Sequence, residues 1–276
     1  MNEDVRRRMD TLTREWSVIV ETAVETDTSV CAFGTRRDQP VVLKVVKREG
    51  DEWRSGVVVA AFQGSGVVRA DEHVDGAALL ERAEPGTPLT GLAIAGRDEA
   101  ATAILAGVIE RLRGHRPPAW CPTVHDWAKG FDAYLAGSDD RIPRELVREA
   151  ALAYARLAAS QSETMLLHGD LQHDNVLQDA RRGWLAIDPK GVIGEIEFEI
   201  GAALRNPVVA PDLFAARKTI ERRLHQLSHL LNLDADRARQ WSFAQAVLSV
   251  VWRVEDGFRV DEADPVLALA RTLRDM

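Results

Sequence analysis

Asp170, Asn175 and Asp188 lie on or beside two short apolar runs within residues 165–188, and a turn at residues 179–183 connects these runs. This pattern predicts a hairpin, with Asn175 entering its first strand and Asp188 leaving its second, so the two side chains should lie close together. Mg²⁺ binds through one or two carboxylates and fills its remaining positions with phosphates and water, which favours this pair as a metal site. Asp170, in the loop just before the hairpin, is placed to accept a proton from a hydroxyl aimed at a metal-bound phosphate.

This pattern has two alternative interpretations. A lone His-Gly-Asp tripeptide is usually a turn, in which glycine supplies backbone freedom and aspartate bonds its own backbone. The coincidence of Asp170, Asn175 and Asp188 at their spacings argues against a simple turn. A zinc hydrolase would draw its ligands from Cys121, His125, His168, Asp170 and His173. The chain has only two cysteines, far apart in sequence, so the closely paired thiolates of many zinc sites are absent.

Two differently patterned parts surround the predicted hairpin. The first is strand-rich, and its expected elements are helices at 4–15 and 49–62 and strands at 17–23, 29–35, 40–46, 66–69 and 77–80. Residues 81–86, Glu-Arg-Ala-Glu-Pro-Gly, break this pattern and are the expected hinge. Beyond them, apolar residues at helical spacing predict helices at 101–112, 146–158, 211–231 and 234–253 and a short one after Pro265. The chain is therefore expected to be an α+β protein, strand-rich over residues 1–82 and mostly helical over 83–276.

Composition excludes several classes of protein. The 276 residues carry 35 Lys and Arg against 43 Asp and Glu, a net charge of −8, and 46% of them are hydrophobic. The chain is too hydrophobic for disorder, and it lacks the basic stripe of a nucleic-acid-binding protein. Its apolar runs are too short to span a membrane, so no membrane partner is expected. A charged N-terminus and the absence of a disulfide framework favour the cytoplasm, whereas the oligomeric state has no signal.

The predicted hairpin resembles the catalytic loop of protein kinases. His-Gly-Asp at 168–170 stands in place of His-Arg-Asp, and Ile-Asp-Pro at 187–189 stands in place of Asp-Phe-Gly. The chain resembles the aminoglycoside phosphotransferase superfamily, whose signature is H-G-D-x-x-x-x-N followed by I-D. Ile-Asp-Pro-Lys-Gly-Val-Ile-Gly-Glu at 187–195 and Ala-Leu-Arg-Asn-Pro at 203–207 are similar to its streptomycin 6-phosphotransferase and hydroxyurea kinase branch.

The resemblance implies a bilobal, protein-kinase-like fold with ATP and Mg²⁺ held between the lobes. Asp170 would be the catalytic base, Asn175 and Asp188 would hold the metal, and His168 would brace the loop, while His173 has no assigned role. Glycine replaces the arginine that meets a phosphorylated activation loop in protein kinases. This replacement points to a constitutively active kinase of small molecules.

Lys44 lies in the otherwise apolar run of residues 40–46, where a charged side chain needs a partner or a ligand. The resemblance makes it the lysine that contacts the α- and β-phosphates and pairs with a carboxylate. Glu52 is the expected partner and Glu49 is its competitor. The alternative is a lysine at a sheet edge that extends its ammonium into water.

The remaining nucleotide contacts come from two loops. Thr28 and Ser29 lie between the first two strands and would hold phosphate oxygens, although this loop lacks the glycines of protein kinases. The backbone of Glu81 and Ala83 at the hinge would meet the adenine.

The acceptor expected from the resemblance is a hydroxyl of streptomycin or a related aminoglycoside or aminocyclitol. Hydroxyurea or an unknown endogenous metabolite is the alternative acceptor, and a catalytically inactive nucleotide-binding module is the alternative function. Carboxylates suit a guanidinium-bearing acceptor, and the expected acceptor-binding residues are Glu195, Trp252, Glu255 and Asp256. Glu197 and Glu199 are instead expected on a solvated helix face.

Overall fold

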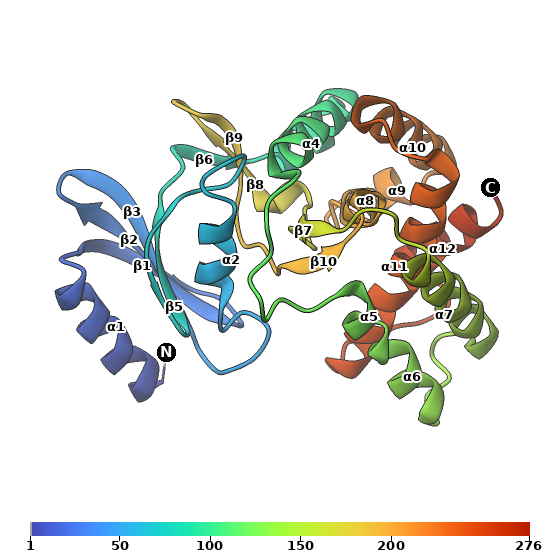
Figure 1. Cartoon of the computed structure of the whole chain (residues 1–276), viewed down its shortest axis with the longest axis horizontal. Helices are drawn as coiled ribbons and strands as arrows, with labels where there is room; N and C mark the ends of the chain where they lie inside the picture. The colour runs from blue at the N-terminus through green and yellow to red at the C-terminus, as the bar shows by residue number, and fades with distance from the viewer. Residues whose placement is uncertain (1) are drawn as a thin grey trace.

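The computed structural model describes residues 2–276, which form a strand-rich part and a helical part (Figure 1). The strand-rich part contains α1 (Glu3–Glu15), β1 (Ile19–Glu25), β2 (Ser29–Arg36), β3 (Gln39–Val46), α2 (Ser55–Ala61), β4 (Ala70–Val74) and β5 (Ala77–Glu81). Its strands form one antiparallel sheet in the order β1-β2-β3-β5-β4. The α+β class and the three consecutive antiparallel strands expected from the sequence are confirmed.

Helices cover both faces of this sheet. α1 lies on the outer face, and α2 lies on the face turned towards the rest of the molecule (Figure 1). Val5, Met9 and Leu12 recur at helical spacing on α1 and are buried in one apolar cluster with Leu43 and Leu79 of the sheet. This apolar stripe is what holds α1 on the sheet.

The helical part begins with a short strand that joins the predicted hairpin. β6 (Pro85–Pro88) pairs with β8 (Val176–Asp179), which pairs with β9 (Gly183–Ala186). β7 (Met165–Leu167) pairs with β10 (Val192–Gly194). The helices are α3 (Thr90–Ile94), α4 (Asp98–Leu112), α5 (Val124–Trp127), α6 (Lys129–Ala136), α7 (Arg144–Ala159), α8 (Ile196–Leu204), α9 (Pro211–Phe214), α10 (Arg217–Leu231), α11 (Ala235–Glu255) and α12 (Pro265–Arg274). A single-turn 3₁₀ helix, His173–Asn175, precedes β8.

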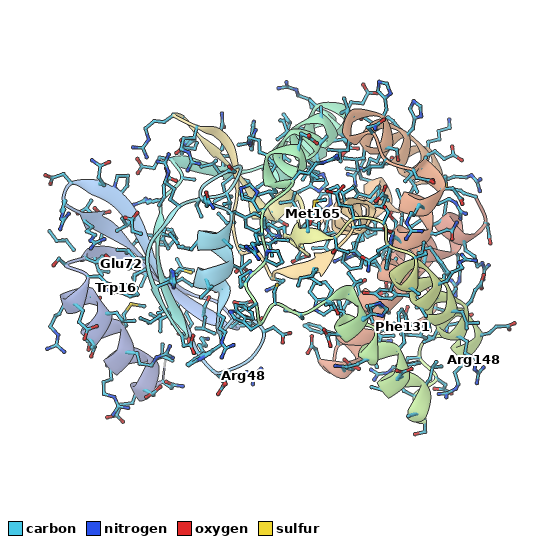
Figure 2. All side chains as sticks on the ribbon, viewed as in Figure 1. Trp16, Arg48, Glu72, Phe131, Arg148 and Met165 are labelled. Carbon is cyan, nitrogen blue, oxygen red and sulfur yellow. The ribbon has the colours of Figure 1, made fainter. Side chains whose placement is uncertain are left out.

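The core of the helical part is built around α11. Its fully buried Trp241 meets Tyr154 of α7 and Phe198 of α8 edge-on, with ring centroids 4.9 Å and 5.1 Å apart. Met165 is buried near the middle of the molecule, whereas Arg148 points outwards from α7 (Figure 2). No helix within residues 2–276 has both the length and the apolar character needed to cross a bilayer.

Three predicted elements differ from the structure. The helix expected at 49–62 begins only at Ser55, because residues 51–54 form a turn held by contacts outside the helix. Trp53 C=O accepts the N–H of Gly76 at 2.6 Å, and the Arg8 guanidinium lies over its ring. The strand expected at 66–69 is a single bridge at Val67. The helix expected at 211–231 is two helices, α9 and α10.

Candidate active site

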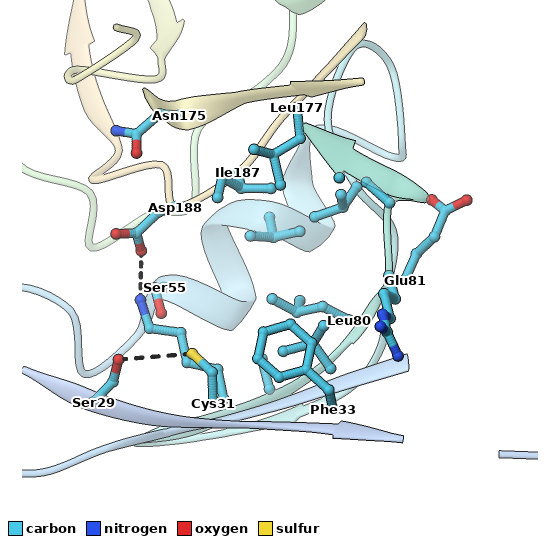
Figure 3. A pocket seen from close by; sticks show the side chains of 18 of the residues that line it. Ser29, Cys31, Phe33, Ser55, Leu80, Glu81, Asn175, Leu177, Ile187 and Asp188 are labelled. Atoms are coloured by element: carbon cyan, nitrogen blue, oxygen red, sulfur yellow. Dashed lines mark hydrogen bonds and ion pairs between the residues drawn. The ribbon is translucent and has the colours of Figure 1, made fainter. Parts of the chain in front are cut away.

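A cleft of about 610 Å³ lies between the sheet and the β8–β9 hairpin (Figure 3). Phe33 of β2 and Leu80 of β5 contribute to its apolar end, near Glu81. Asn175 and Asp188 lie at its opposite, polar end. A volume of this size suits a nucleotide, whose base is apolar on its faces and whose phosphates are charged.

Lys44 connects the two parts of the chain at the polar end. Its ammonium lies 2.9 Å from Glu52 Oε2 and 2.5 Å from Asp188 Oδ1. Burial disfavours the charge of Lys44, but the carboxylates of Asp188 and Glu52 outweigh burial and raise the pKa of the ammonium. The expected pairing of Lys44 with Glu52 is confirmed, although Glu52 lies in the turn before α2 and not on a helix.

The hairpin brings Asn175 and Asp188 to one place. Ile187 N–H donates to Asn175 C=O at 2.9 Å, which ties the two ends of the hairpin together. Asn175 Nδ2 donates to the C=O of Asp170 at 2.9 Å, and its side-chain oxygen is turned towards Asp188 (Figure 3). Burial opposes the charge of Asp188, but Lys44 and Lys190 lower the pKa of this carboxyl. An amide oxygen beside an ionised carboxylate is a donor set that fits Mg²⁺.

Asp170 follows a sharp turn at Gly169, whose φ of +82° lies in the left-handed region. A Cβ at Gly169 would lie 2.8 Å from the Trp127 ring, so the loop needs glycine here for space as well. Asp170 N–H donates to His168 Nδ1 at 3.3 Å, and His168 Nε2 lies 2.9 Å from the C=O of Ile187. Burial lowers the pKa of His168 to about 4, so the neutral ring braces the loop, as expected.

Two charged residues that support Asp170 were missed by sequence reasoning. The buried carboxylate of Glu199 on α8 accepts the N–H groups of His168 and Gly169 at 2.7 Å and 3.1 Å. Arg205, just after α8, places Nη2 3.4 Å from Asp170 Oδ1. The expectation that Glu199 lies on a solvated helix face is wrong, because its side chain is buried. Glu199 lies among apolar residues in the sequence, and the same pattern indicated a partner for Lys44.

Lys190 is a third residue that sequence reasoning missed. Its ammonium lies 2.7 Å from Glu52 Oε1. Burial of Asp170 raises the pKa of its carboxyl, while the charges of Arg205 and Lys190 act in the opposite direction. A base with a raised pKa binds a proton more readily, which suits the role expected of Asp170.

The prediction that Glu195 contacts the acceptor is wrong. Glu195 is buried at the N-terminus of α8, where its Oε1 accepts Arg237 Nε at 2.5 Å and also Trp241 Nε1. A carboxylate that is already paired inside the core cannot meet a ligand in the cleft. It connects α8 to α11 instead.

Trp252, Glu255 and Asp256 occupy different positions around the C-terminal end of α11. The half-buried Trp252 packs edge-on against Trp127 at a centroid distance of 5.4 Å, and Trp127 in turn abuts Gly169. Trp252 is thus one aromatic ring away from the loop of Asp170. Glu255 borders a separate hollow of about 450 Å³, and the exposed Asp256 is the residue that caps α11.

The remaining predicted residues lie as follows. Thr28 and Ser29 border the cleft, and Thr28 Oγ1 donates to Glu52 Oε2 at 3.1 Å. Glu81 and Ala83 border the opposite end. The buried ring of His173 has no hydrogen-bond partner, and burial lowers its pKa to about 3, so it is a neutral core residue. No cluster of three or more His, Cys, Asp or Glu ligands occurs within residues 2–276, so the zinc alternative has no site there.

The family described as "Aminoglycoside/hydroxyurea antibiotic resistance kinase" matches residues 16–257 of this chain. The chain belongs to this family. It is 36% identical over 236 residues to hydroxyurea phosphotransferase of Kitasatospora aureofaciens, an alignment that covers 79% of this chain and 66% of that protein. It is 33% identical over 254 residues to streptomycin 3''-kinase of Klebsiella pneumoniae, with 86% and 90% covered. It is 32% identical over 223 residues to streptomycin 6-kinase of Streptomyces glaucescens, with 77% and 70% covered.

Solved structures confirm the fold of this kinase family member. A choline kinase from Streptococcus pneumoniae superposes with a TM-score of 0.66 at 12% identity, covering 100% of both chains. An aminoglycoside phosphotransferase crystallised with ADP and hygromycin B superposes with a TM-score of 0.64 at 14% identity, covering 96% of this chain and 97% of that one. The bilobal kinase-like architecture expected from the sequence is therefore confirmed.

Proposed function

We propose that this protein transfers the γ-phosphoryl group of ATP to a hydroxyl of streptomycin or a related aminocyclitol, with Mg²⁺ as cofactor. The observation that carries this proposal is the convergence of Asp170, Asn175 and Asp188 with the Lys44–Glu52 pair at one end of a nucleotide-sized cleft. Each of these residues supplies one of the parts that phosphoryl transfer requires. The reaction belongs in the cytoplasm, where ATP is available.

The residues at the polar end divide the work of holding the nucleotide. Lys44 binds phosphate oxygens, and Glu52 keeps its ammonium in place. The side-chain oxygens of Asn175 and Asp188 would hold Mg²⁺, which neutralises phosphate charge when it is bound. The backbone of Glu81 and Ala83 borders the end that we assign to the adenine. Catalysis then rests on placement and charge, with no covalent enzyme intermediate.

Asp170 accepts the proton of the acceptor hydroxyl as that oxygen attacks phosphorus. Arg205 Nη2, 3.4 Å from Asp170 Oδ1, favours the ionised form that can accept a proton. Glu199 fixes the loop through its bonds to the backbone of His168 and Gly169. The position of Asp170 therefore depends on α8 as well as on the hairpin.

The acceptor would lie beside Trp252, with Asp256 and Glu255 at its edge. A guanidinium or ammonium group is attracted to an aromatic face and to carboxylates, which is what a streptomycin-like acceptor would need. Trp252 is connected to the catalytic loop through Trp127, so this surface is close to Asp170. Glu195 has no part in it.

Hydroxyurea is the second candidate acceptor. The observation that favours it is the 36% identity to hydroxyurea phosphotransferase. A catalytically inactive nucleotide-binding module is disfavoured, because Lys44, Asp170, Asn175 and Asp188 are all present.

A coupled ADP-release assay with Mg²⁺-ATP tests the proposal. Streptomycin, other aminoglycosides and hydroxyurea are supplied to the wild type and to Asp170→Asn. We expect streptomycin to stimulate ADP release, and Asp170→Asn to lose at least about a hundredfold in kcat while its affinity for ATP stays close to that of the wild type. If hydroxyurea alone stimulates ADP release, hydroxyurea and not streptomycin is the acceptor. A near-normal rate in Asp170→Asn would show that Asp170 is not the catalytic base.

A further inference from the structure

Lys190 lies beside the residues that hold the phosphates in the proposed function and has no task in it so far. Its ammonium is 2.7 Å from Glu52 Oε1 and 3.9 Å from Asp188 Oδ2. Lys44 contacts the other oxygen of each of these carboxylates, at 2.9 Å and 2.5 Å. The two lysines and two carboxylates therefore alternate around a ring of four charges.

The backbone of Lys190 is fixed to the catalytic loop. The N–H groups of Lys190 and Gly191 donate to the C=O of His168 at 2.9 Å and 3.1 Å, two residues before Asp170. Gly191 has a φ of +76°, and a Cβ there would lie 2.8 Å from the side chain of Val58. The lysine stem is less confined, because the Lys190 side chain is 28% exposed while that of Lys44 is 11% exposed.

The cations near Asp170 decide which side chain is free to meet a γ-phosphate at this end of the cleft. The loop between β1 and β2 has no glycine that would let backbone N–H groups approach phosphate, which leaves charged side chains as the donors to phosphate there. The positive charges of Arg205 and Lys190 both lower the pKa of Asp170. Arg205 also donates a hydrogen bond to the side-chain oxygen of Gln245 at 2.8 Å. Lys190 is the one of the two that also reaches the carboxylates around Lys44.

We propose that Lys190 binds the γ-phosphate and stabilises the phosphoryl group during its transfer, while Lys44 binds the phosphates that remain in ADP. This inference rests on the proposed function. In the transfer, the bond from the γ-phosphorus to the β–γ bridging oxygen breaks, and a bond from phosphorus to the acceptor oxygen forms. The hydroxyl proton goes to Asp170 and ADP leaves. Lys190 keeps its proton throughout and donates hydrogen bonds to the non-bridging oxygens.

A purely structural role for Lys190 would change nucleotide affinities in a different way. If Lys190 only held Glu52 in place, its loss would act through Glu52 and Lys44 and would weaken all adenine nucleotides alike. If it binds the γ-phosphate, its loss weakens only nucleotides that have one. ADP and a non-hydrolysable imido analogue of ATP separate these cases without an acceptor and without turnover.

The experiment is calorimetric titration of both nucleotides, with Mg²⁺, into the wild type, Lys190→Met, Lys190→Arg and Lys218→Met. Lys218 is an exposed lysine of α10 and serves as the matched control. We expect Lys190→Met to weaken binding of the analogue at least about tenfold, because a charged hydrogen bond is lost, and to change ADP affinity less than about twofold. Lys190→Arg should keep most of the wild-type ratio between the affinities for the analogue and for ADP. Lys218→Met should leave this ratio unchanged.

Equal weakening of both nucleotides by Lys190→Met, or no change in the analogue, would overturn the assignment of Lys190. Lys190→Gln replaces Lys190→Met if thermal unfolding shows that the methionine variant does not fold. A wild type that binds neither nucleotide would overturn the proposed function itself, so the two failures are distinguishable.

Discussion

The Arg205 guanidinium acts on the ionisation of Asp170, the proposed base. Burial raises the pKa of Asp170, and the nearby charge of Arg205 lowers it. Removing that charge in Arg205→Met therefore raises the pKa of Asp170 further. Because only ionised Asp170 accepts a proton, the acid limb of the profile of kcat/KM against pH should move to higher pH.

The measurement is kcat/KM across the pH range for the wild type, Arg205→Met and Arg217→Met. Arg217 is an exposed arginine paired with Glu221 on α10, and its variant should reproduce the wild-type profile. The loss in Arg205→Met should be several-fold at the acidic end and small at the alkaline end. An acid limb that stays in place would show that Arg205 does not act on the ionisation of Asp170.

Residue by residue, sequence reasoning found the side chains whose spacing is local and missed those whose partners are distant. Asn175 and Asp188 meet because one hairpin joins them, and the pairing of Lys44 with Glu52 is a short-range contact in the chain. Glu195 was misassigned because its partners, Arg237 and Trp241, come more than forty positions later. A single sequence does not reveal such a pairing.

At the scale of elements, α8 holds the catalytic loop through one buried carboxylate. Burial raises the pKa of Glu199 to about 7, from the ordinary value of 4.5 for a glutamate. Between these values the folded chain binds a proton that the unfolded chain does not. The stabilisation from this proton is complete below pH 4.5 and is lost as the pH rises through about 7.

Urea unfolding of the wild type and Glu199→Gln, near pH 5 and near pH 8, checks this linkage. The free energy of unfolding of the wild type, relative to the variant, should fall by up to about 3 kcal/mol between the two conditions. A difference that is the same at both pH values would mean that Glu199 does not change its proton affinity on folding.

The observed bounds of helices and strands match the predicted bounds where the local sequence pattern determines them. They differ where tertiary contacts determine them. α1, β2 and β3 start and end within one residue of their predicted bounds, because their apolar periodicity and turns are local signals. α2 starts late because Glu52 and Trp53 are held by Lys44, Arg8 and Gly76. The short elements β4, β6, β10, α3, α5, α6 and α8 were not predicted.

At the scale of the whole molecule, a buried ion pair ties α10 to α4. The Asp98 carboxylate lies 2.6 Å from Arg223 Nη2, and the Arg223 side chain is 1% exposed. Asp98→Asn leaves this guanidinium buried without its counter-charge, so we expect a loss of about 3 kcal/mol or more in the free energy of unfolding. The exposed pair of Arg217 with Glu221 on the same helix is the comparison.

Urea unfolding of Asp98→Asn and Glu221→Gln measures the contrast. The surface variant should lose no more than about 0.5 kcal/mol, because exposed pairs are screened by water. Comparable losses in the two variants would show that the buried pair contributes no more to the free energy of unfolding than an exposed pair does.

The division of the chain between residues 82 and 83 remains a prediction. The strand pairing on either side of this point is consistent with it. The sheet ends at Glu81, and the next strand, β6, pairs with β8 of the hairpin. Val58 and Phe62 of the first part nevertheless belong to the large apolar core of the helical part. The two parts thus share apolar packing, which suits the proposed nucleotide site between them.

The most direct test of the central claim is analysis of the acceptor after incubation with the enzyme and Mg²⁺-ATP. Mass spectrometry and phosphorus NMR would show whether streptomycin has gained one phosphoryl group on a hydroxyl, and ADP is measured in the same sample. We predict phosphorylated streptomycin and ADP in equal amounts with the wild type, and neither with Asp170→Asn. Unmodified streptomycin beside accumulating ADP, or phosphorylation that persists in Asp170→Asn, would contradict the account.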